Sequence, residues 1–285
     1  MPPMTLNCTW QDMMREAIPR LAGAGVEHPA REARMLLAHA LGIAPVNVII
    51  REMDAVDPAG LTAFEQAIQR RLNHEPVSRI RGSREFYGRS FIVTPDVLDP
   101  RPETELLVEE GLKRLPPNGR VLDLGTGSGC ILLSILGERS DASGVGVDIS
   151  PAALTVAKRN AEALQIGRAT FIEGSWEAGL AQAPFDLVLS NPPYIPDADI
   201  PGLAPDVRNY DPGLALAGGT DGLDPYRVIL GLAERLLKPG ASIGVEFGLG
   251  QGETVASLMA KAGLTDVMLL KDLAGHERAA FSRRP

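Results

Sequence analysis

Apolar residues in the N-terminal part of the chain recur at intervals of three and four positions, the spacing of one face of an α-helix. The clearest series are Leu36, Leu37, Ala40 and Leu41, and Leu61, Phe64, Ile68 and Leu72. Asp57 and Pro58 form a cap and first-turn pair, so a helix is expected to begin there. Residues 9–73 therefore predict a small helical bundle, and we assign an N-terminal domain to residues 1–74.

The pattern changes over residues 75–97, where the helical spacing is lost. Residues 86–93 place aromatic and aliphatic side chains around a Tyr-Gly pair, which predicts two short strands joined by a turn. Pro95 and Pro100 then stiffen the backbone. We interpret residues 75–97 as a β-hairpin linker and residues 98–285 as a second domain.

From residue 120 onward, short apolar runs alternate with longer amphipathic segments. Strands are expected at 120–124, 144–148, 169–172, 185–190 and 241–247. Helices are expected at 101–114, 131–139, 151–164, 225–237 and 252–262. This alternation predicts an α/β domain whose mostly parallel sheet is covered on both faces. The last two runs, 265–271 and 279–283, predict an antiparallel hairpin at the end of the sheet.

Composition and charge narrow the classes of protein that fit this pattern. Of the 285 residues, 45% are hydrophobic and 22% are charged, as in an ordinary globular protein. The net charge of −8 argues against naked DNA or RNA as the main partner, which would favour a clustered basic face. No stretch approaches the roughly 20 apolar residues of a membrane helix, and residues 1–16 lack a signal-peptide core. We expect a cytoplasmic protein with no membrane or direct nucleic-acid partner.

The cysteines and arginines add little chemistry to this picture. Cys8 and Cys130 have neither a CxxC nor a metal-ligand spacing, so we expect no metal and a reducing compartment. Positive charge is concentrated between the two domains, at Arg70, Arg71, Arg79, Arg81, Arg84 and Arg89. We interpret these arginines as solvated or salt-bridged, with partner binding as the alternative.

A glycine-rich turn joins the first predicted strand of the second domain to a helix. It consists of Gly125, Thr126, Gly127, Ser128 and Gly129, in a GxGxG spacing that differs from the GxGxxG of nicotinamide-binding turns. Its glycines would let a cofactor approach the backbone, and the helix N-terminus would favour a carboxylate. Asp123 points at the same turn and could hold an ammonium group, directly or through water. A plain packing turn is the alternative.

Two further residues follow neighbouring strands. Asp148 ends the next strand, where a carboxylate can accept hydrogen bonds from both hydroxyls of a ribose. Its alternative role is to cap the following helix, but Ser150 is better placed for that. Trp176 follows the third strand, and we interpret it as part of an adenine pocket, with core packing as the alternative.

The most informative motif is Asn191-Pro192-Pro193-Tyr194, directly after the strand at 185–190. Two prolines cannot continue a central strand, so the chain must leave the sheet there, at the edge where α/β folds bind ligands. The Asn191 oxygen and the Pro192 carbonyl provide two acceptors for a planar NH2 group, on which the Tyr194 ring can stack. Together with the glycine turn, this motif predicts methyl transfer to nitrogen from S-adenosylmethionine.

The chain resembles the HemK-type (PrmC) N5-glutamine methyltransferases, which modify peptide chain release factors, over nearly its whole length. The resemblance rests on the helical N-terminal domain, the GxGxG turn, Asn191 to Tyr194, and the runs 101–105 and 221–227. It implies a class I S-adenosylmethionine-dependent methyltransferase fold, Rossmann-like, with a seven-stranded sheet and a substrate-recognising N-terminal domain. It also implies a monomer that methylates the glutamine of the Gly-Gly-Gln loop in class I release factors, modulating translation termination.

The resemblance also implies roles for individual residues. Asn191, Pro192 and Tyr194 would be catalytic, and together with Pro193 they would hold the substrate glutamine. The cofactor would contact Asp123, Gly125, Thr126, Gly127, Ser128, Gly129, Asp148, Trp176 and Asn191. Relatives usually carry an acid where this chain has Ser175, so adenine affinity is expected to be lower unless Glu177 substitutes.

Three other functions remain as alternatives. An enzyme that methylates a ribosomal-protein glutamine would use the same motif. An adenine-N6 nucleic-acid methyltransferase would also use it, but would need base flipping and a strongly basic face. A cofactor-binding protein without activity is disfavoured because the Asn-Pro-Pro-Tyr motif is intact.

Overall fold

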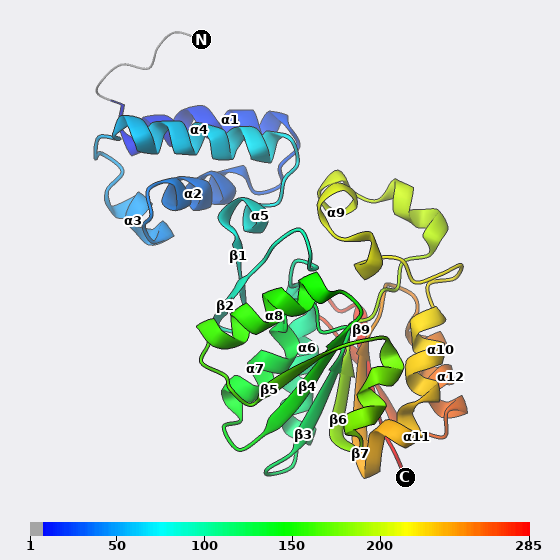
Figure 1. Ribbon diagram of the computed structural model, residues 1–285. Coiled ribbons are helices and arrows are strands. Elements are labelled where there is room, and N and C mark those ends of the chain that lie inside the picture. The colour runs from blue at the N-terminus through cyan, green and yellow to red at the C-terminus, as the bar shows by residue number, and fades with distance from the viewer. Residues whose placement is uncertain (1–7) are drawn as a thin grey trace. The chain divides into compact units, whose positions relative to one another are not determined.

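The computed structural model describes residues 8–285 and divides the chain into an N-terminal unit, Met1–Gly82, and a C-terminal unit, Ser83–Pro285. The described part of the N-terminal unit is helical (Figure 1). Its helices are α1 (Trp10–Gly23), α2 (Pro29–Ala40), α3 (Pro45–Ile50), α4 (Pro58–Leu72) and α5 (Val77–Arg81). Members of both predicted helical series, including Leu37 and Ile68, are buried in a single cluster, which confirms the expected bundle.

Helices α4 and α5 differ in how well the sequence predicted them. The Asp57 carboxylate accepts a hydrogen bond from the Gly60 backbone N–H at 2.6 Å, which confirms the predicted start of α4. Helix α5, by contrast, lies where we expected a linker. Its Ile80 is buried in the core of the N-terminal unit, which therefore extends to Gly82. A helix of five residues is too short to show a hydrophobic period in the sequence.

The C-terminal unit opens with an antiparallel hairpin of β1 (Ser83–Phe86) and β2 (Arg89–Ile92), as predicted. Tyr87 and Gly88 both have positive φ, the backbone that a tight two-residue hairpin turn needs. Phe86 and Phe91 pack edge to face, with ring centroids 6.0 Å apart, and both are buried.

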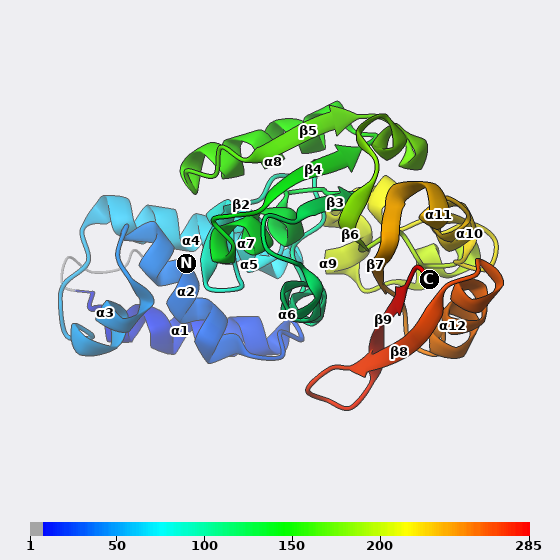
Figure 2. The same cartoon turned by 90° about the horizontal axis from the view of Figure 1, so that it is seen from below.

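After the hairpin, the chain forms a seven-stranded sheet with the strand order β5-β4-β3-β6-β7-β9-β8 (Figures 1 and 2). Strands β3 to β7 run parallel, and β9 pairs antiparallel with both β7 and β8. The expected mostly parallel sheet with its end hairpin is therefore confirmed. The strands are β3 (Arg120–Leu124), β4 (Ser143–Asp148), β5 (Ala169–Glu173), β6 (Phe185–Ser190), β7 (Leu237–Glu246), β8 (Thr265–Lys271) and β9 (Glu277–Arg283).

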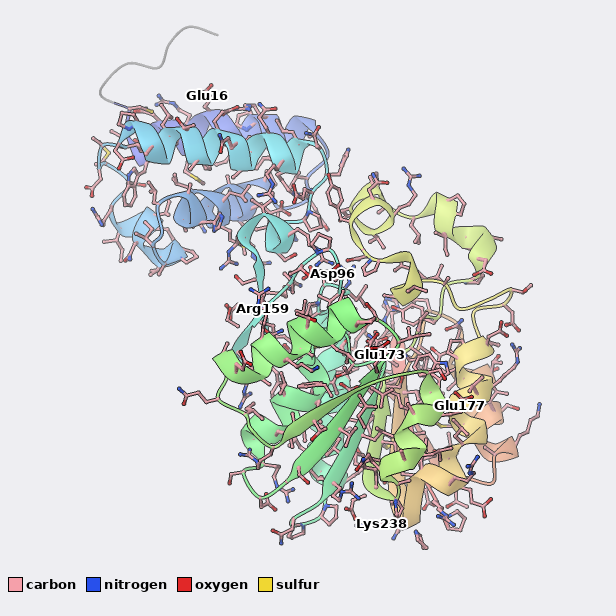
Figure 3. All side chains as sticks on the ribbon, viewed as in Figure 1. Glu16, Asp96, Arg159, Glu173, Glu177 and Lys238 are labelled. Atoms are coloured by element: carbon pink, nitrogen blue, oxygen red, sulfur yellow. The ribbon has the colours of Figure 1, made fainter. Side chains whose placement is uncertain are left out.

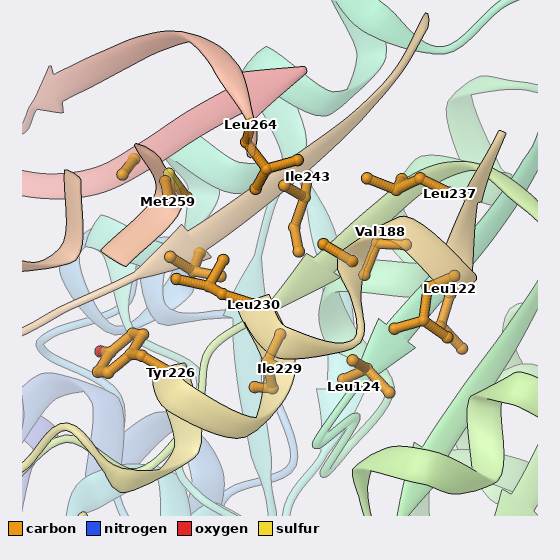
Figure 4. Packing of buried hydrophobic residues seen from close by; sticks show 14 of the residues in the cluster. Leu122, Leu124, Val188, Tyr226, Ile229, Leu230, Leu237, Ile243, Met259 and Leu264 are labelled. Carbon is orange, nitrogen blue, oxygen red and sulfur yellow. The ribbon is translucent and has the colours of Figure 1, made fainter. Parts of the chain in front are cut away.

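Alternate residues of the central strands pack into two separate layers. Val121 of β3 and Leu187 of β6 join a cluster with residues of α6 (Glu105–Arg114) and α7 (Cys130–Glu138). Their neighbours Leu122 and Val188 face the opposite layer, where Figure 4 shows them with Tyr226, Ile229, Leu230 and Met259. These come from α10 (Asp224–Gly231) and α12 (Gly252–Lys261). A strand buried on both faces reads as a continuous apolar run, which is why the sequence predicted it.

The remaining segments refine the expected pattern. The predicted helix at 101–114 begins as a 3-10 turn, η1 (Pro102–Thr104), and the predicted helix at 225–237 is divided into α10 and α11 (Ala233–Leu236). Helix α8 (Pro151–Ala163) precedes β5, and η2 (Trp176–Gln182) precedes β6. Between β6 and α10 the chain forms η3 (Asp197–Gly202), α9 (Pro205–Tyr210) and η4 (Gly213–Ala215). We call residues 195–223 the connecting segment.

We expect Asn160→Ala to destabilise the C-terminal unit by about 2–4 kcal/mol. The fully buried Asn160 side chain accepts from Ile92 N–H at 2.7 Å and donates to the carbonyls of Ile92 and Ser128. Alanine would leave all three backbone groups without that partner. Urea unfolding followed by circular dichroism measures the change, and Lys158→Ala on the exposed side of α8 is the control. Equal stability of the two variants would contradict the prediction.

Candidate active site

The parallel register brings the ends of four strands into one row. Leu124 pairs with both Val147 and Ser190, and Ser190 pairs with Val245. The residues one position further along form the row. They are Gly125 after β3, Asp148 at the end of β4, Asn191 after β6 and Glu246 at the end of β7. This row lies at the carboxyl edge of the sheet, while Lys238, near the start of β7, lies at the opposite end, as Figure 3 shows. The sequence predicted the first three of these residues as site residues.

The glycine turn is held open by backbone hydrogen bonds. The N–H groups of Gly125 and Thr126 both donate to the Val147 carbonyl at 2.9 Å. Gly125, Gly127 and Gly129 all have positive φ, which side chains other than glycine rarely adopt. A Cβ at Gly125 would lie 3.4 Å from the Trp176 ring, and one at Gly127 would meet no atom within 4 Å. At Gly127 the turn therefore presents bare backbone to open space, as a cofactor that lies close to the chain requires.

Asp123 lies beneath the turn. Its side chain is fully buried, and the Thr126 hydroxyl donates to one carboxylate oxygen at 2.6 Å. The other oxygen has no hydrogen-bond partner in the structure. Burial raises the pKa of Asp123 to about 7, and the nearby charge of Asp148 adds to the rise. Asp123 does not line the cavity above the turn, so the ammonium contact predicted for it stays a prediction.

Asp148 holds the turn and faces the cavity at the same time. One of its oxygens accepts from Gly127 N–H at 2.8 Å, and the other accepts from Ser150 N–H at 2.9 Å. Ser150, as expected, caps α8 by accepting from Ala153 N–H at 3.2 Å. A carboxylate offers about four lone pairs, so Asp148 keeps acceptors for two further donors.

A cavity of about 190 Å³ lies above the turn, and we call it the first cavity. Trp176 lines it and also packs against the sheet core, so its core packing is confirmed and its contact with adenine stays a prediction. Ser175 lines it as well, and its hydroxyl donates to the Glu177 carboxylate at 2.6 Å, which lowers the pKa of Glu177. Among residues predicted for the cofactor, Gly125, Thr126, Gly127, Ser128, Asp148, Trp176 and Asn191 line this cavity.

A second cavity of about 260 Å³ adjoins the first. Asn191 lines both cavities, Pro193 lines the first, and Tyr194 lines the second. Pro192 is buried and lines neither. Burial raises the pKa of the Tyr194 hydroxyl to about 12, so the ring presents a neutral phenol. The motif therefore lies at the junction between the two cavities.

Four charged residues of the second cavity were not singled out as site residues from the sequence. Arg101, Glu103, Glu246 and Arg278 line it, and Glu246 is only 3% exposed. Burial raises the pKa of Glu246 to about 7. A glutamate near the end of the apolar run 241–247 was the available signal for Glu246. Arg278 lies in the end hairpin, whose contact with this site depends on the antiparallel pairing of β9 with β7.

The connecting segment covers both cavities from one side. Pro212 and Leu214 line the first cavity, and Leu203 and Val207 line the second. An ion pair of 2.6 Å joins Arg101, which lines both cavities, to the buried Asp211 of this segment. Residues close to this site thus come from segments that are far apart in the sequence.

Residues 8–285 contain neither a membrane-spanning helix nor a metal-binding cluster. No helix there is long and apolar enough to cross a membrane. No group of three or more His, Cys, Asp or Glu side chains in that part of the chain is placed to hold a metal ion.

Two domain families and a solved structure match parts of the chain. The PrmC N-terminal domain family matches residues 12–82, and the methyltransferase domain family matches residues 115–249. A solved 16S rRNA N2 G1207 methyltransferase of T. thermophilus, in complex with AdoMet and guanosine, shares the fold, with 23% identity and a TM-score of 0.51. That match covers 71% of this chain and 50% of the other.

Curated relatives match the chain over most of its length. The release factor glutamine methyltransferase of Rhodospirillum rubrum is 51% identical over 93% of this chain and 82% of its own length. That of Cereibacter sphaeroides is 46% identical over 96% of this chain and 98% of its own. At this identity and coverage the relationship extends through both units, and the chain belongs to the release factor glutamine methyltransferase family.

Proposed function

We propose that this protein transfers the methyl group of S-adenosylmethionine to the side-chain amide nitrogen of a glutamine, in the Gly-Gly-Gln loop of class I release factors. The observation that carries the proposal is the position of Asn191, which lines both the cavity above the glycine turn and the cavity beside Tyr194. A residue at such a junction can contact methyl donor and acceptor together. Membership of the family supports the choice of glutamine as acceptor.

The first cavity fits the methyl donor. The bare backbone at Gly127 leaves room for the methionine portion of the cofactor. The N-terminus of α7 favours the carboxylate of that portion. Asp148 retains acceptors for the ribose hydroxyls, and Trp176 provides a flat apolar wall for the adenine ring. Bound there, S-adenosylmethionine would supply an electrophilic methyl group. When the bond between the methyl carbon and sulfur breaks, its electron pair stays on sulfur.

The second cavity would hold the glutamine side chain. An amide nitrogen is a poor nucleophile because its lone pair is delocalised into the carbonyl group. Acceptors at both N–H bonds, from Asn191 Oδ1 and the Pro192 carbonyl, would favour a pyramidal nitrogen whose lone pair points at the methyl carbon. The nitrogen forms the new bond with that pair and then releases one proton to water. Catalysis therefore consists of positioning and of fixed dipoles.

We further propose separate roles for the two units. The described side chains that line the two cavities all belong to the C-terminal unit, which leaves recognition of the release factor to the N-terminal unit. Because one chain supplies both cavities, we propose that the protein acts as a monomer. We propose the cytoplasm as its location, since release factors work there, and no direct contact with nucleic acid.

The direct test is methylation of purified release factor followed by mass mapping of the modified peptide. We expect one methyl group on the glutamine of the Gly-Gly-Gln loop. A release factor with asparagine there should not be methylated. Its side chain is shorter by one methylene, so the amide nitrogen would lie about 1.3–1.5 Å further from the methyl carbon. Methyl transfer to ribosomal protein or to DNA in parallel reactions, with none to release factor, would favour the alternative substrates.

We expect Asp148→Ala to weaken cofactor binding about tenfold or more. The substitution removes one or two charge-assisted hydrogen bonds to the ribose, each worth about 1.5–3 kcal/mol, and frees the Gly127 N–H. Calorimetric titration with S-adenosylmethionine measures the affinity. Glu173→Ala is the matched control, because this exposed carboxylate ends the neighbouring strand β5 but does not line the cavity. Unchanged affinity would limit Asp148 to holding the turn.

A chain that starts at Ser83 should bind S-adenosylmethionine like the full chain but methylate whole release factor poorly. The start is chosen because the β1–β2 hairpin belongs to the C-terminal unit. We expect kcat/KM for the whole factor to fall about tenfold or more, a loss of about 1.4 kcal/mol. A short Gly-Gly-Gln peptide is the control substrate, for which both chains should perform alike. Equal activity on the whole factor would exclude a recognition role for the N-terminal unit.

A further inference from the structure

A buried carboxyl group lies beside Asn191, and the proposed mechanism leaves it without a role. Glu246 ends β7 next to the end of β6, since Ser190 pairs with Val245. Its side chain is 3% exposed and lines the second cavity together with Asn191 and Tyr194. Its Oε2 atom has no hydrogen-bond partner in the structure. Because buried carboxyl groups are costly, one retained at a substrate cavity indicates a function.

Thr104 lies between this carboxyl group and the proposed catalytic residue. The Asn191 side-chain NH2 donates to the Thr104 hydroxyl oxygen at 3.2 Å. Thr104 and Asn191 are both close enough to the Glu246 carboxyl group to lower its pKa. Thr104 is itself buried, so water cannot freely replace either partner. All three side chains therefore form one polar group between the helix start at 102–105 and the ends of two strands.

The chemistry of these groups fixes the direction of each hydrogen bond. An ionised carboxylate can only accept, and a threonine hydroxyl has a single hydrogen to donate. Thr104 can therefore donate its one hydrogen to ionised Glu246 while its oxygen accepts from the Asn191 NH2. The Asn191 amide is then held with its NH2 toward Thr104 and Glu246. Its oxygen faces the other way.

This orientation matters because the two ends of an asparagine amide have nearly the same size and shape. Without the carboxylate, the Thr104 hydroxyl could donate to the Asn191 oxygen equally well, and the NH2 would then face the substrate. An NH2 group there would repel the N–H bonds of the glutamine amide. We infer that ionised Glu246 is a positioning residue, which acts through Thr104 to keep the Asn191 oxygen directed at the substrate nitrogen. The inference rests on the proposed function.

Protonation of Glu246 should reverse the effect. The protonated group can donate to Thr104, whose own hydrogen is then free to turn to the Asn191 oxygen. Burial and Glu103 raise the pKa of Glu246 to about 7, while Thr104, Arg278 and Asn191 act in the opposite direction. The charge of Glu246 also helps to raise the pKa values of Tyr194, Tyr226 and Cys130, which burial raises first. Arg101 lines the same cavity. Methyl transfer should therefore be lost as the pH falls through about 7.

The test compares Glu246→Gln with the wild type over pH 6 to about 9. Glutamine has the same shape, but its NH2 can donate to Thr104 at every pH. At pH 8 we expect kcat to fall about tenfold or more, while the calorimetric affinity for S-adenosylmethionine changes less than about twofold. The loss of rate below pH 7 should be absent from the variant. Glu109→Gln, on the exposed face of α6, is the matched control and should keep both the rate and the profile.

A second pair of variants tests the same chain of hydrogen bonds without touching the carboxyl group. Thr104→Ser keeps the hydroxyl and should retain most of the rate, whereas Thr104→Val should lose about as much as Glu246→Gln. Because both changes break one chain, the double variant should be little worse than either single one. If Glu246→Gln does not fold, the comparison of Thr104→Ser with Thr104→Val tests the inference in its place.

The outcomes separate the inference from the proposed function. If the wild type does not methylate glutamine of release factor, the proposed function fails, and the inference fails with it. If the wild type is active and Glu246→Gln keeps its rate and its pH profile, the inference alone is overturned. Additive losses in the double variant, or equal rates for Thr104→Ser and Thr104→Val, would also overturn it.

Discussion

The register of the parallel strands is the constraint on which the site depends. Parallel strands all end at one edge of the sheet, and their pairing aligns the residues that follow them. Here the alignment of Leu124 with Val147 and Ser190 places a bare glycine turn, a carboxylate and an asparagine side by side. A shift of one residue in β6 would turn its apolar side chains to the wrong layer, so the packing of the core also fixes the position of Asn191.

Buried polar groups hold this edge rigid. Asp123 supports the turn through Thr126, and Glu246 contacts Thr104 and Asn191 from the other side. Burial raises the pKa of both carboxyl groups to about 7. Each also leaves one oxygen without a partner in the structure. Such groups do not stabilise a fold efficiently, but they hold donors and acceptors in fixed directions before a substrate arrives.

The site takes its walls from segments that are distant in the sequence. The run 96–104 reaches it before the sheet begins, and the connecting segment returns to it after β6. The ion pair of Arg101 with the buried Asp211 joins these two segments. One contact at the site is local in sequence. The Ser175 hydroxyl, at the cavity wall, donates a hydrogen bond to the carboxylate of Glu177, which does not line the cavity.

Much of the fold and part of the site followed from the sequence alone, because their signals are local. A strand buried on both faces is a continuous apolar run, a helix start carries a cap such as Asp57, and the proline pair after Asn191 must leave the sheet. The positions of the Gly125 turn, Asp148 and Asn191 at strand ends followed from the same patterns. Their meeting at one edge required only that the strands be parallel.

Tertiary structure decided what no local pattern encodes. Helix α5 belongs to the N-terminal unit because Ile80 finds a core there, which five residues of sequence cannot show. Arg278 reaches the second cavity only through the pairing of β9 with β7. Asn191 donates to Thr104, 87 residues before it, and lines the second cavity with Glu246, 55 residues after it in the chain. Such contacts depend on packing between distant segments, whereas sequence patterns report the environment of neighbours along the chain.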